Sequence, residues 1–218
     1  MRLVVACAAA LLLGACGSKT ASPPPNSGTT SSGTAASANA PATSTSAAAG
    51  TFDCARPANP AQQLVCNDPQ LTGLDHRVQT AYQQALGRPG ADTAGLNSAQ
   101  GAWTAVRDGC GGAADTRPCL EEAYQTRLVQ LAIADPATAA PPVVTYNCPA
   151  GSGPLTAQFY NQFDPQTAVL NWKGTQQILF IRPAASGAHY GNRGADFWEH
   201  QGDVNVELGG TKFVCHTQ

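Results

Sequence analysis

Two short segments near the C-terminus combine side chains that suit recognition of another protein. The first contains a Ser-Gly turn followed by a histidine and a tyrosine, and the second contains a tryptophan, a glutamate, a histidine and another Gly turn. A hydroxyl and an imidazole exposed on loops of a rigid scaffold can exchange hydrogen bonds with groups in a partner's cleft. The candidate binding residues are Ser186, Gly187, His189, Tyr190, Trp198 and His200.

Each of these residues also has an ordinary structural explanation. A serine beside a glycine commonly forms only a turn, and Tyr190 and Trp198 are large enough to support a core or a loop. Taken alone, His189 and His200 would be exposed histidines without a special role.

Patterns for catalysis or metal binding are weak. Asp196 and Glu199 are a candidate carboxylate pair, but their neighbours do not indicate the environment that would raise the pKa of a catalytic acid. The strings Gly-x-Ser-x-Gly, His-Glu-x-x-His and Cys-x-x-Cys do not occur. We therefore predict a binding protein that is not an enzyme and uses neither a metal ion nor a cofactor.

Residues 1–15 have the features of an export signal. Arg2 gives a positive start, an apolar run too short to span a bilayer follows, and small residues precede Cys16. The ending Leu-Gly-Ala-Cys resembles the bacterial lipoprotein box, which implies lipidation of Cys16. Residues 16–50 are rich in Ser, Thr, Ala, Pro and Gly with Lys19 as the single charge, so we expect a disordered tether.

Charge argues against nucleic acid as a partner. The 218 residues include 12 basic and 14 acidic side chains, and removal of Arg2 with the signal peptide leaves 11 basic ones, a balance of −3. No basic patch is present, whereas binding to phosphates needs clustered Lys and Arg. A slightly acidic surface favours encounter with a cationic protein.

Residues 51–135 show the apolar spacing of three antiparallel helices. A short helical turn is expected around residues 61–65, before the breaker Asp68-Pro69. The apolar stripes of the longer helices cover residues 71–86, 99–106 and 120–131. We interpret three arginines beside these stripes as solvated helix-face charges paired with nearby acids: Arg77, Arg107 and Arg127.

Six cysteines remain in the mature chain besides Cys16, and in an exported protein this even number indicates three disulfides. In the helical domain, antiparallel packing is expected to bring Cys66 and Cys110 together. That bond would leave Cys54 to pair with Cys119. Three connectivities are possible for these four cysteines, and the sequence alone does not choose among them.

A Pro/Ala/Thr linker at residues 136–142 leads to a module at 143–218 that has the pattern of an antiparallel sheet or small barrel. Its short alternating runs are separated by Gly, Asn, Asp and Pro. A Cys148–Cys215 disulfide would join the first and last strands. The fold class predicted from these patterns is α+β, with a small disulfide-stapled antiparallel helical domain followed by an antiparallel sheet or antiparallel β-barrel.

The C-terminal module carries Ser-Gly-x-x-Tyr from Ser186, Phe197-Trp198, Gly202-Asp203 and a flanking Tyr146-x-Cys148. In these motifs it resembles the MliC family, bacterial inhibitors of c-type lysozyme with an eight-stranded antiparallel barrel. The cysteines and aromatic residues of residues 51–135 resemble the N-terminal domain of the LprI family.

The MliC resemblance implies a mechanism in which the serine of the Ser-Gly-x-x-Tyr loop reaches the catalytic carboxylates of lysozyme. By position this serine is Ser186. The family's second contact is a lysine two residues after the tryptophan, and that position is His200 here. The segment Trp-Glu-His-Gln-Gly is one residue longer than the family pattern and lacks the fixed charge.

Together these patterns predict a lipid-anchored inhibitor of c-type lysozyme on the extracytoplasmic face of the cell membrane. Its partners would be lysozyme and, through the lipid on Cys16, the membrane. The alternative is a structural or adhesive cell-envelope lipoprotein whose barrel binds a glycan or an envelope protein.

Overall fold

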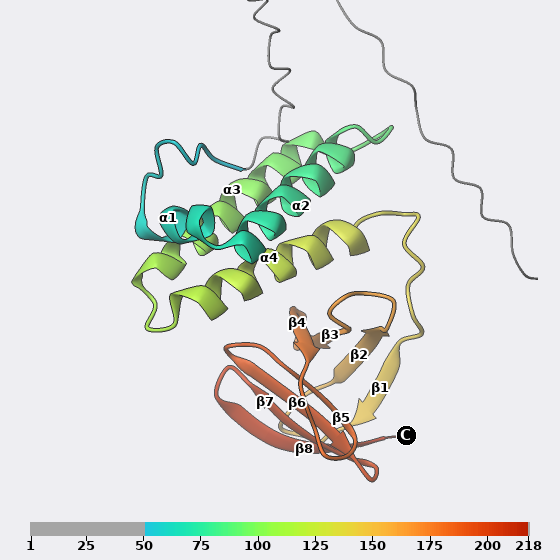
Figure 1. Ribbon diagram of the computed structural model, residues 1–218. Coiled ribbons are helices and arrows are strands. Elements are labelled where there is room, and N and C mark those ends of the chain that lie inside the picture. Colours follow the sequence, from blue (N-terminus) through green and yellow to red (C-terminus); the bar gives the residue numbers. More distant parts are fainter. Residues whose placement is uncertain (1–50, 218) are drawn as a thin grey trace, which may run out of the picture. The chain divides into compact units, whose positions relative to one another are not determined.

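The computed structural model describes residues 51–217, which fold into helices followed by a β-barrel (Figure 1). No helix within this range is both long enough and apolar enough to cross a membrane. The predicted signal peptide, the lipidation of Cys16 and the tether at residues 16–50 lie outside the described residues.

The helical part contains four α-helices and a short 3₁₀ helix. The segment predicted as a short turn is a complete helix, and the three longer helices occur where the apolar stripes indicated. The helices are α1 (Pro60–Asn67), α2 (Pro69–Leu86), α3 (Thr93–Gly109), η1 (Cys110–Gly112) and α4 (Thr116–Ile133).

Local sequence fixes where α1 and α2 begin. Each has proline at its first position, where no backbone N–H is needed, preceded by a side chain that caps the first turn. Asn59 accepts a hydrogen bond from Gln62 N at 2.9 Å. Asp68 accepts from the backbone N–H groups of Gln70 and Leu71 and also pairs with Arg117 Nε at 2.8 Å.

The Asp68 carboxylate should make the free energy of unfolding depend on pH. The Leu71 N–H bond is the largest cause that lowers the pKa of Asp68, and Arg117 adds to it. A lowered folded-state pKa means that the stabilisation is complete above the ordinary carboxyl value and is lost as pH falls through the folded value. Asn can still cap α2 but does not titrate. We therefore expect the free energy of unfolding of Asp68→Asn to fall less than that of the wild type when the pH is lowered from neutral to about 3. Thermal unfolding at both pH values checks this, and equal losses would contradict it.

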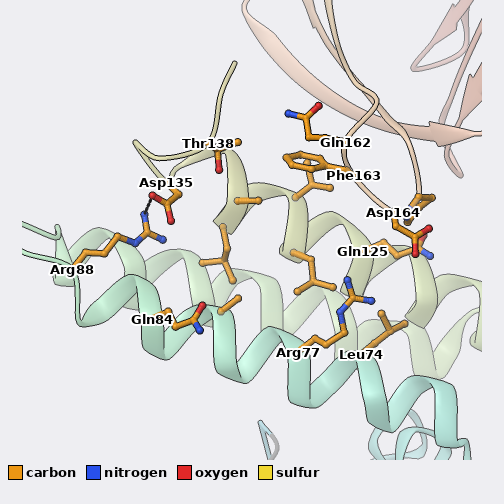
Figure 2. Close-up of a pocket in the computed structure, with 16 residues that line it drawn as sticks. Leu74, Arg77, Gln84, Arg88, Gln125, Asp135, Thr138, Gln162, Phe163 and Asp164 are labelled. Atoms are coloured by element: carbon orange, nitrogen blue, oxygen red, sulfur yellow. Dashed lines mark ion pairs between the residues drawn. The ribbon is translucent and has the colours of Figure 1, made fainter. Parts of the chain in front are cut away.

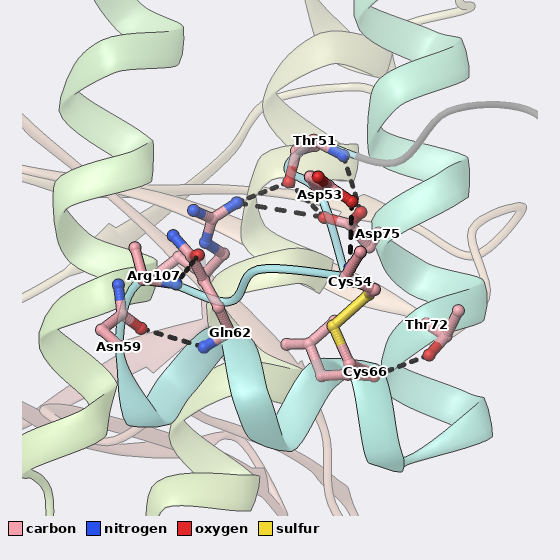
Figure 3. Close-up of a disulfide and its surroundings, with 12 residues drawn as sticks. Thr51, Asp53, Cys54, Asn59, Gln62, Cys66, Thr72, Asp75 and Arg107 are labelled. Carbon is pink, nitrogen blue, oxygen red and sulfur yellow. Dashed lines mark hydrogen bonds and ion pairs between the residues drawn. A yellow bond between two sulfur atoms is a disulfide. The ribbon is translucent and has the colours of Figure 1, made fainter.

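The helices enclose a polar network, which corrects the prediction of solvated side chains for Arg107 and Arg127; Arg77 is exposed, as predicted. Arg107 and Arg127 are 1% and 3% exposed, and Asp75 is 3% exposed. Arg107 lies 3.9 Å from Asp75 and 2.7 Å from Asp108. Figure 3 shows Arg107 directed at Thr51 and Asp75, so the network joins the start of the described chain to α2 and α3.

Both predicted disulfides of the helical domain are wrong. The structure pairs Cys54 with Cys66 and Cys110 with Cys119, not Cys66 with Cys110 and Cys54 with Cys119. The reason is the length of α1. η1 packs at the start of α1, where a Cβ on Gly111 would lie 3.2 Å from Ala61 N, whereas Cys66 lies at the other end. Cys66 instead meets the incoming segment (Figure 3).

The C-terminal part is a closed antiparallel barrel in which each strand pairs with its sequence neighbours and β1 pairs with β8. The predicted Cys148–Cys215 bond is present and joins the residue after β1 to β8. The strands are β1 (Val144–Asn147), β2 (Leu155–Tyr160), β3 (Thr167–Trp172), β4 (Thr175–Ile181), β5 (Ala188–Gly191), β6 (Ala195–His200), β7 (Asp203–Leu208) and β8 (Thr211–Thr217).

Three hairpins of the barrel use two-residue turns in which both residues have positive φ. This geometry matches the twist of the flanking strands and favours glycine at the second position. The turns are Lys173-Gly174, Gln201-Gly202 and Gly209-Gly210. They fix the register of the strands that they join, including β6 and β7.

The barrel interior is filled by side chains from alternate positions of the strands, as the period-two pattern predicted for residues 155–159 and 204–208. Among them, Phe197 contacts Tyr146 edge-on with ring centroids 5.6 Å apart. The barrel is therefore a packed core rather than a ligand cavity. Its fully buried members include Leu155, Ala157, Ala168, Leu170, Leu179, Phe197, Val204, Leu208 and Cys215.

The two segments predicted as recognition loops are mostly strands. His189 and Tyr190 lie in β5, Trp198 lies in β6, and His200 is the last residue of β6. Only Ser186 and Gly187 of the candidate residues lie in a loop.

Candidate functional site

One end of the barrel brings the candidate residues together. Because consecutive strands are antiparallel, the β4–β5 connection and the β6–β7 turn lie at the same end, and the β1–β2 loop lies at the opposite end. The β4–β5 connection spans residues 182–187 and the β6–β7 turn is Gln201-Gly202. We call this end, with the adjoining outer faces of β5 and β6, the candidate site.

Ser186 is exposed at the tip of the site, and its backbone is held by two contacts. Its carbonyl oxygen accepts a hydrogen bond from Trp198 Nε1 at 3.1 Å. The next residue, Gly187, has φ +75° and lies so close to β6 that an added Cβ would be 2.0 Å from the carbonyl oxygen of Glu199. The hydroxyl of Ser186 makes no hydrogen bond with residues 51–217, so it is available to a partner.

The outer face of β5 and β6 carries aromatic and imidazole rings. Trp198 is 39% exposed and stacks on His200, with ring centroids 6.0 Å apart and an interplanar angle of 27°. The His189 ring is 6.1 Å from the Trp198 ring, and His189 Nε2 is 2.7 Å from Asp196 Oδ2. An amphipathic aromatic surface of this kind can contribute contact area and hydrogen bonds at once.

The inner face of the same strands is different in character, and it corrects one candidate. Tyr190 is 4% exposed and contacts Phe159 in the core, so it supports the site from inside and is not a surface contact. Glu199 also points inward and accepts a hydrogen bond from Tyr146 Oη at 3.1 Å. Burial, followed by the nearby Glu199 carboxylate, raises the pKa of both Tyr146 and Tyr190.

A second pair of polar residues, Asp203 and His216, lies near His200 and was not predicted from the sequence. The register places Asp203 opposite both His200 on β6 and His216 on β8. His216 Nδ1 lies 2.9 Å from Asp203 Oδ1. The alternation in β7 and β8 would have placed Asp203 and His216 on the outer face once the two-residue turn was recognised.

The carboxylate pair considered from the sequence is not assembled. Asp196 is on the outer face with His189, whereas Glu199 is on the inner face with Tyr146. Within residues 51–217, no group of three or more His, Cys, Asp or Glu side chains could hold a metal ion.

Comparison with known proteins identifies relatives along most of the chain. Lipoprotein LprI of Mycobacterium tuberculosis and that of Mycobacterium bovis are each 60% identical to it over 184 residues, which cover 84% of this chain and 92% of theirs. The chain belongs to the LprI family. The match spans both the helical domain and the barrel, as the sequence motifs indicated.

Within this LprI family member, residues 146–214 match the model of a second family, described as membrane-bound lysozyme-inhibitor of c-type lysozyme, MliC. The matched range runs from β1 to β8 and contains every candidate binding residue. The matched family is one of inhibitors and not of enzymes, as the sequence predicted. No solved structure shows a significant match to this LprI family member.

Proposed function

We propose that this protein is a lipid-anchored inhibitor of c-type lysozyme whose β4–β5 connection enters the active-site cleft of the enzyme. Anchoring would occur through Cys16 on the extracytoplasmic face of the membrane. The match of the barrel to the lysozyme-inhibitor family supports the partner. The observation that carries the mechanism is the fixed, exposed position of Ser186 next to the Trp198–His200 stack.

The chemistry of lysozyme suits a hydroxyl at this position. The enzyme works with one protonated and one ionised carboxyl group on either side of its sugar-binding cleft. A serine hydroxyl can accept a hydrogen bond from the first and donate one to the second without burying a charge. Because Trp198 and Gly187 fix the backbone at Ser186, little conformational entropy is lost on binding.

His200 takes the position of the family's lysine and would act from the rim of the same surface. Its ring stacks on Trp198, which orients it, and it can donate a hydrogen bond to a carboxylate.

We expect Ser186→Ala to raise the inhibition constant for a c-type lysozyme by about tenfold or more, because hydrogen bonds to charged groups contribute about 1.5–3 kcal/mol. His200→Ala should act in the same direction. Tight-binding inhibition assays with the disulfide-intact full chain measure both effects.

The matched control is Ser152→Ala. Ser152 lies in the β1–β2 loop at the opposite end of the barrel, and its carbonyl oxygen also accepts a hydrogen bond from a tryptophan, Trp172 Nε1 at 2.7 Å. This substitution should leave inhibition unchanged. Equal inhibition constants for all three variants would reject the proposed contact. If the wild-type protein bound a cell-wall glycan but did not bind lysozyme, the result would favour the adhesive alternative.

A further inference from the structure

The helical domain contains a buried cation that no acidic side chain neutralises. Arg127 of α4 is 3% exposed and forms no ion pair with any acid within residues 51–217. Its Nε donates to Gln100 Oε1 at 2.9 Å, and its Nη1 reaches Gln130 Oε1 only at 3.4 Å. Its Nη2 is buried without an acceptor among the described residues.

This arrangement is unusual for a protein interior. Buried charges are ordinarily paired, and a buried polar group without a hydrogen bond costs free energy. Arg107 in the same domain follows the rule, since it lies beside Asp75 and Asp108. Burial lowers the pKa of Arg127, which is the direction expected when the charged form lacks compensation.

Arg127 lies in the wall of a pocket of about 520 Å³ at the end of the helical domain that holds the α2–α3 loop. This volume is in the range of sites for small organic molecules. One acid, Asp92, lines the pocket, and its carboxylate already caps α3 through Gly95 N. The wall is otherwise mainly apolar and includes Ala85, Pro89, Leu96, Ala99, Leu131 and Ala134.

The second arginine of the pocket is already engaged. Arg88 lies 3.7 Å from Asp135 and donates to the carbonyl oxygen of Ala134, and Figure 2 shows it directed at Asp135. Arg127 is therefore the cation of this pocket that lacks an anionic partner among residues 51–217.

We propose that this pocket binds a small amphipathic carboxylate, with its carboxylate on Arg127 and its apolar body against the α2, α3 and α4 wall. The bound carboxylate would displace the Gln130 side chain, whose hydrogen bond with Arg127 Nη1 is long. When the Gln130 side chain moves away, Nη1 and Nη2 present two parallel N–H groups, which is the arrangement that a carboxylate accepts bidentately. This site is separate from the barrel residues proposed to bind lysozyme.

The test uses sodium octanoate as the probe and 1-octanol as its neutral counterpart, titrated into the full chain by calorimetry. Octanoate should bind saturably and at least about tenfold more tightly than 1-octanol, because the ion pair with a buried guanidinium is charge-assisted. Absence of saturable octanoate binding, or equal affinity for both probes, would overturn the proposal.

Variants assign the binding to the guanidinium. Arg127→Met keeps the side-chain length and removes the charge, so octanoate affinity should fall at least about tenfold while unliganded thermal stability does not decrease. If Arg127→Met does not fold, octanoate affinity is measured with Arg127→Lys instead. This variant keeps the charge but not the planar guanidinium, so it should also bind octanoate more weakly. The control is Arg77→Met, the same change at an exposed arginine of α2. Unchanged affinity in the folded Arg127 variants would contradict the site.

Discussion

Replacement of Gly187 by alanine is expected to raise the inhibition constant for lysozyme at least about 30-fold, the equivalent of one binding hot spot of about 2 kcal/mol. The new Cβ would lie 2.0 Å from the carbonyl oxygen of Glu199 and 3.3 Å from the Cα of His200. These are backbone atoms of β6, and Glu199 is paired with Ala188 on one side and Val204 on the other. The β4–β5 connection must therefore move, and Ser186 moves with it.

The control for this prediction is Gly174→Ala in the β3–β4 turn. Gly174 has φ +76°, almost the same as the φ of +75° at Gly187, but an added Cβ there would meet nothing within 4 Å. Both alanines carry the strain of positive φ, about 1–2 kcal/mol, whereas only the Gly187 variant has the clash. Gly174→Ala should lose stability in thermal unfolding and keep full inhibition. Comparable inhibition by the two variants would show that the position of Ser186 is not important.

The helices could be predicted from the sequence because their signals are local. Proline after Asp68, apolar residues at helical spacing and the glycines of the turns identify α2 without reference to the rest of the chain. The eight-strand closure of the barrel followed from the family resemblance, because short alternating runs predict strands but not how a sheet closes.

From the sequence, β5 and β6 are interpreted as loops because histidines and a glutamate, residue types typical of binding sites, interrupt their apolar alternation. In β6 the inward positions are Ala195, Phe197 and Glu199, and a glutamate is not the residue type that predicts an inward position. Its partner Tyr146 is 53 residues away in sequence, so a local pattern could not supply the explanation. The separation of Ser186 in a loop from Trp198 in a strand was hidden for the same reason.

The cysteine pairing and the buried arginines depended on packing that the sequence does not record. The length of α1 places Cys66 at the end of the helix away from η1, and there it meets Cys54. Arg107 and Arg127 lie beside the apolar stripes, where a long side chain can turn either to water or inward. Asp75 on α2 and Asp108 on α3 lie beside Arg107, whereas Arg127 forms no ion pair with an acid of residues 51–217.

The second large effect is expected for Arg107→Ala, which should lower the free energy of unfolding of the helical domain by about 3–5 kcal/mol. The side chains of Arg107 and Asp75 are 2% and 5% exposed, so removing the arginine leaves a buried carboxylate without its cation. Tyr124 Oη and Thr51 N still donate to Asp75, at 2.9 and 2.7 Å, but they supply no charge. The substitution also removes the contact of the guanidinium with the Phe52 ring, 4.9 Å from its centroid.

Urea unfolding followed by far-ultraviolet circular dichroism, which reports the helices, measures this loss with the disulfides intact. Arg56→Ala is the control, because Arg56 and its partner Asp53 have side chains 88% and 58% exposed and such pairs contribute little. If the network acts through charge, the double variant Arg107→Met with Asp75→Asn should lose less stability than the sum of the losses of Arg107→Met alone and Asp75→Asn alone, since no uncompensated charge remains. Additive losses would mean that Arg107 stabilises the domain by packing against Phe52 and Trp103 and not by neutralising Asp75.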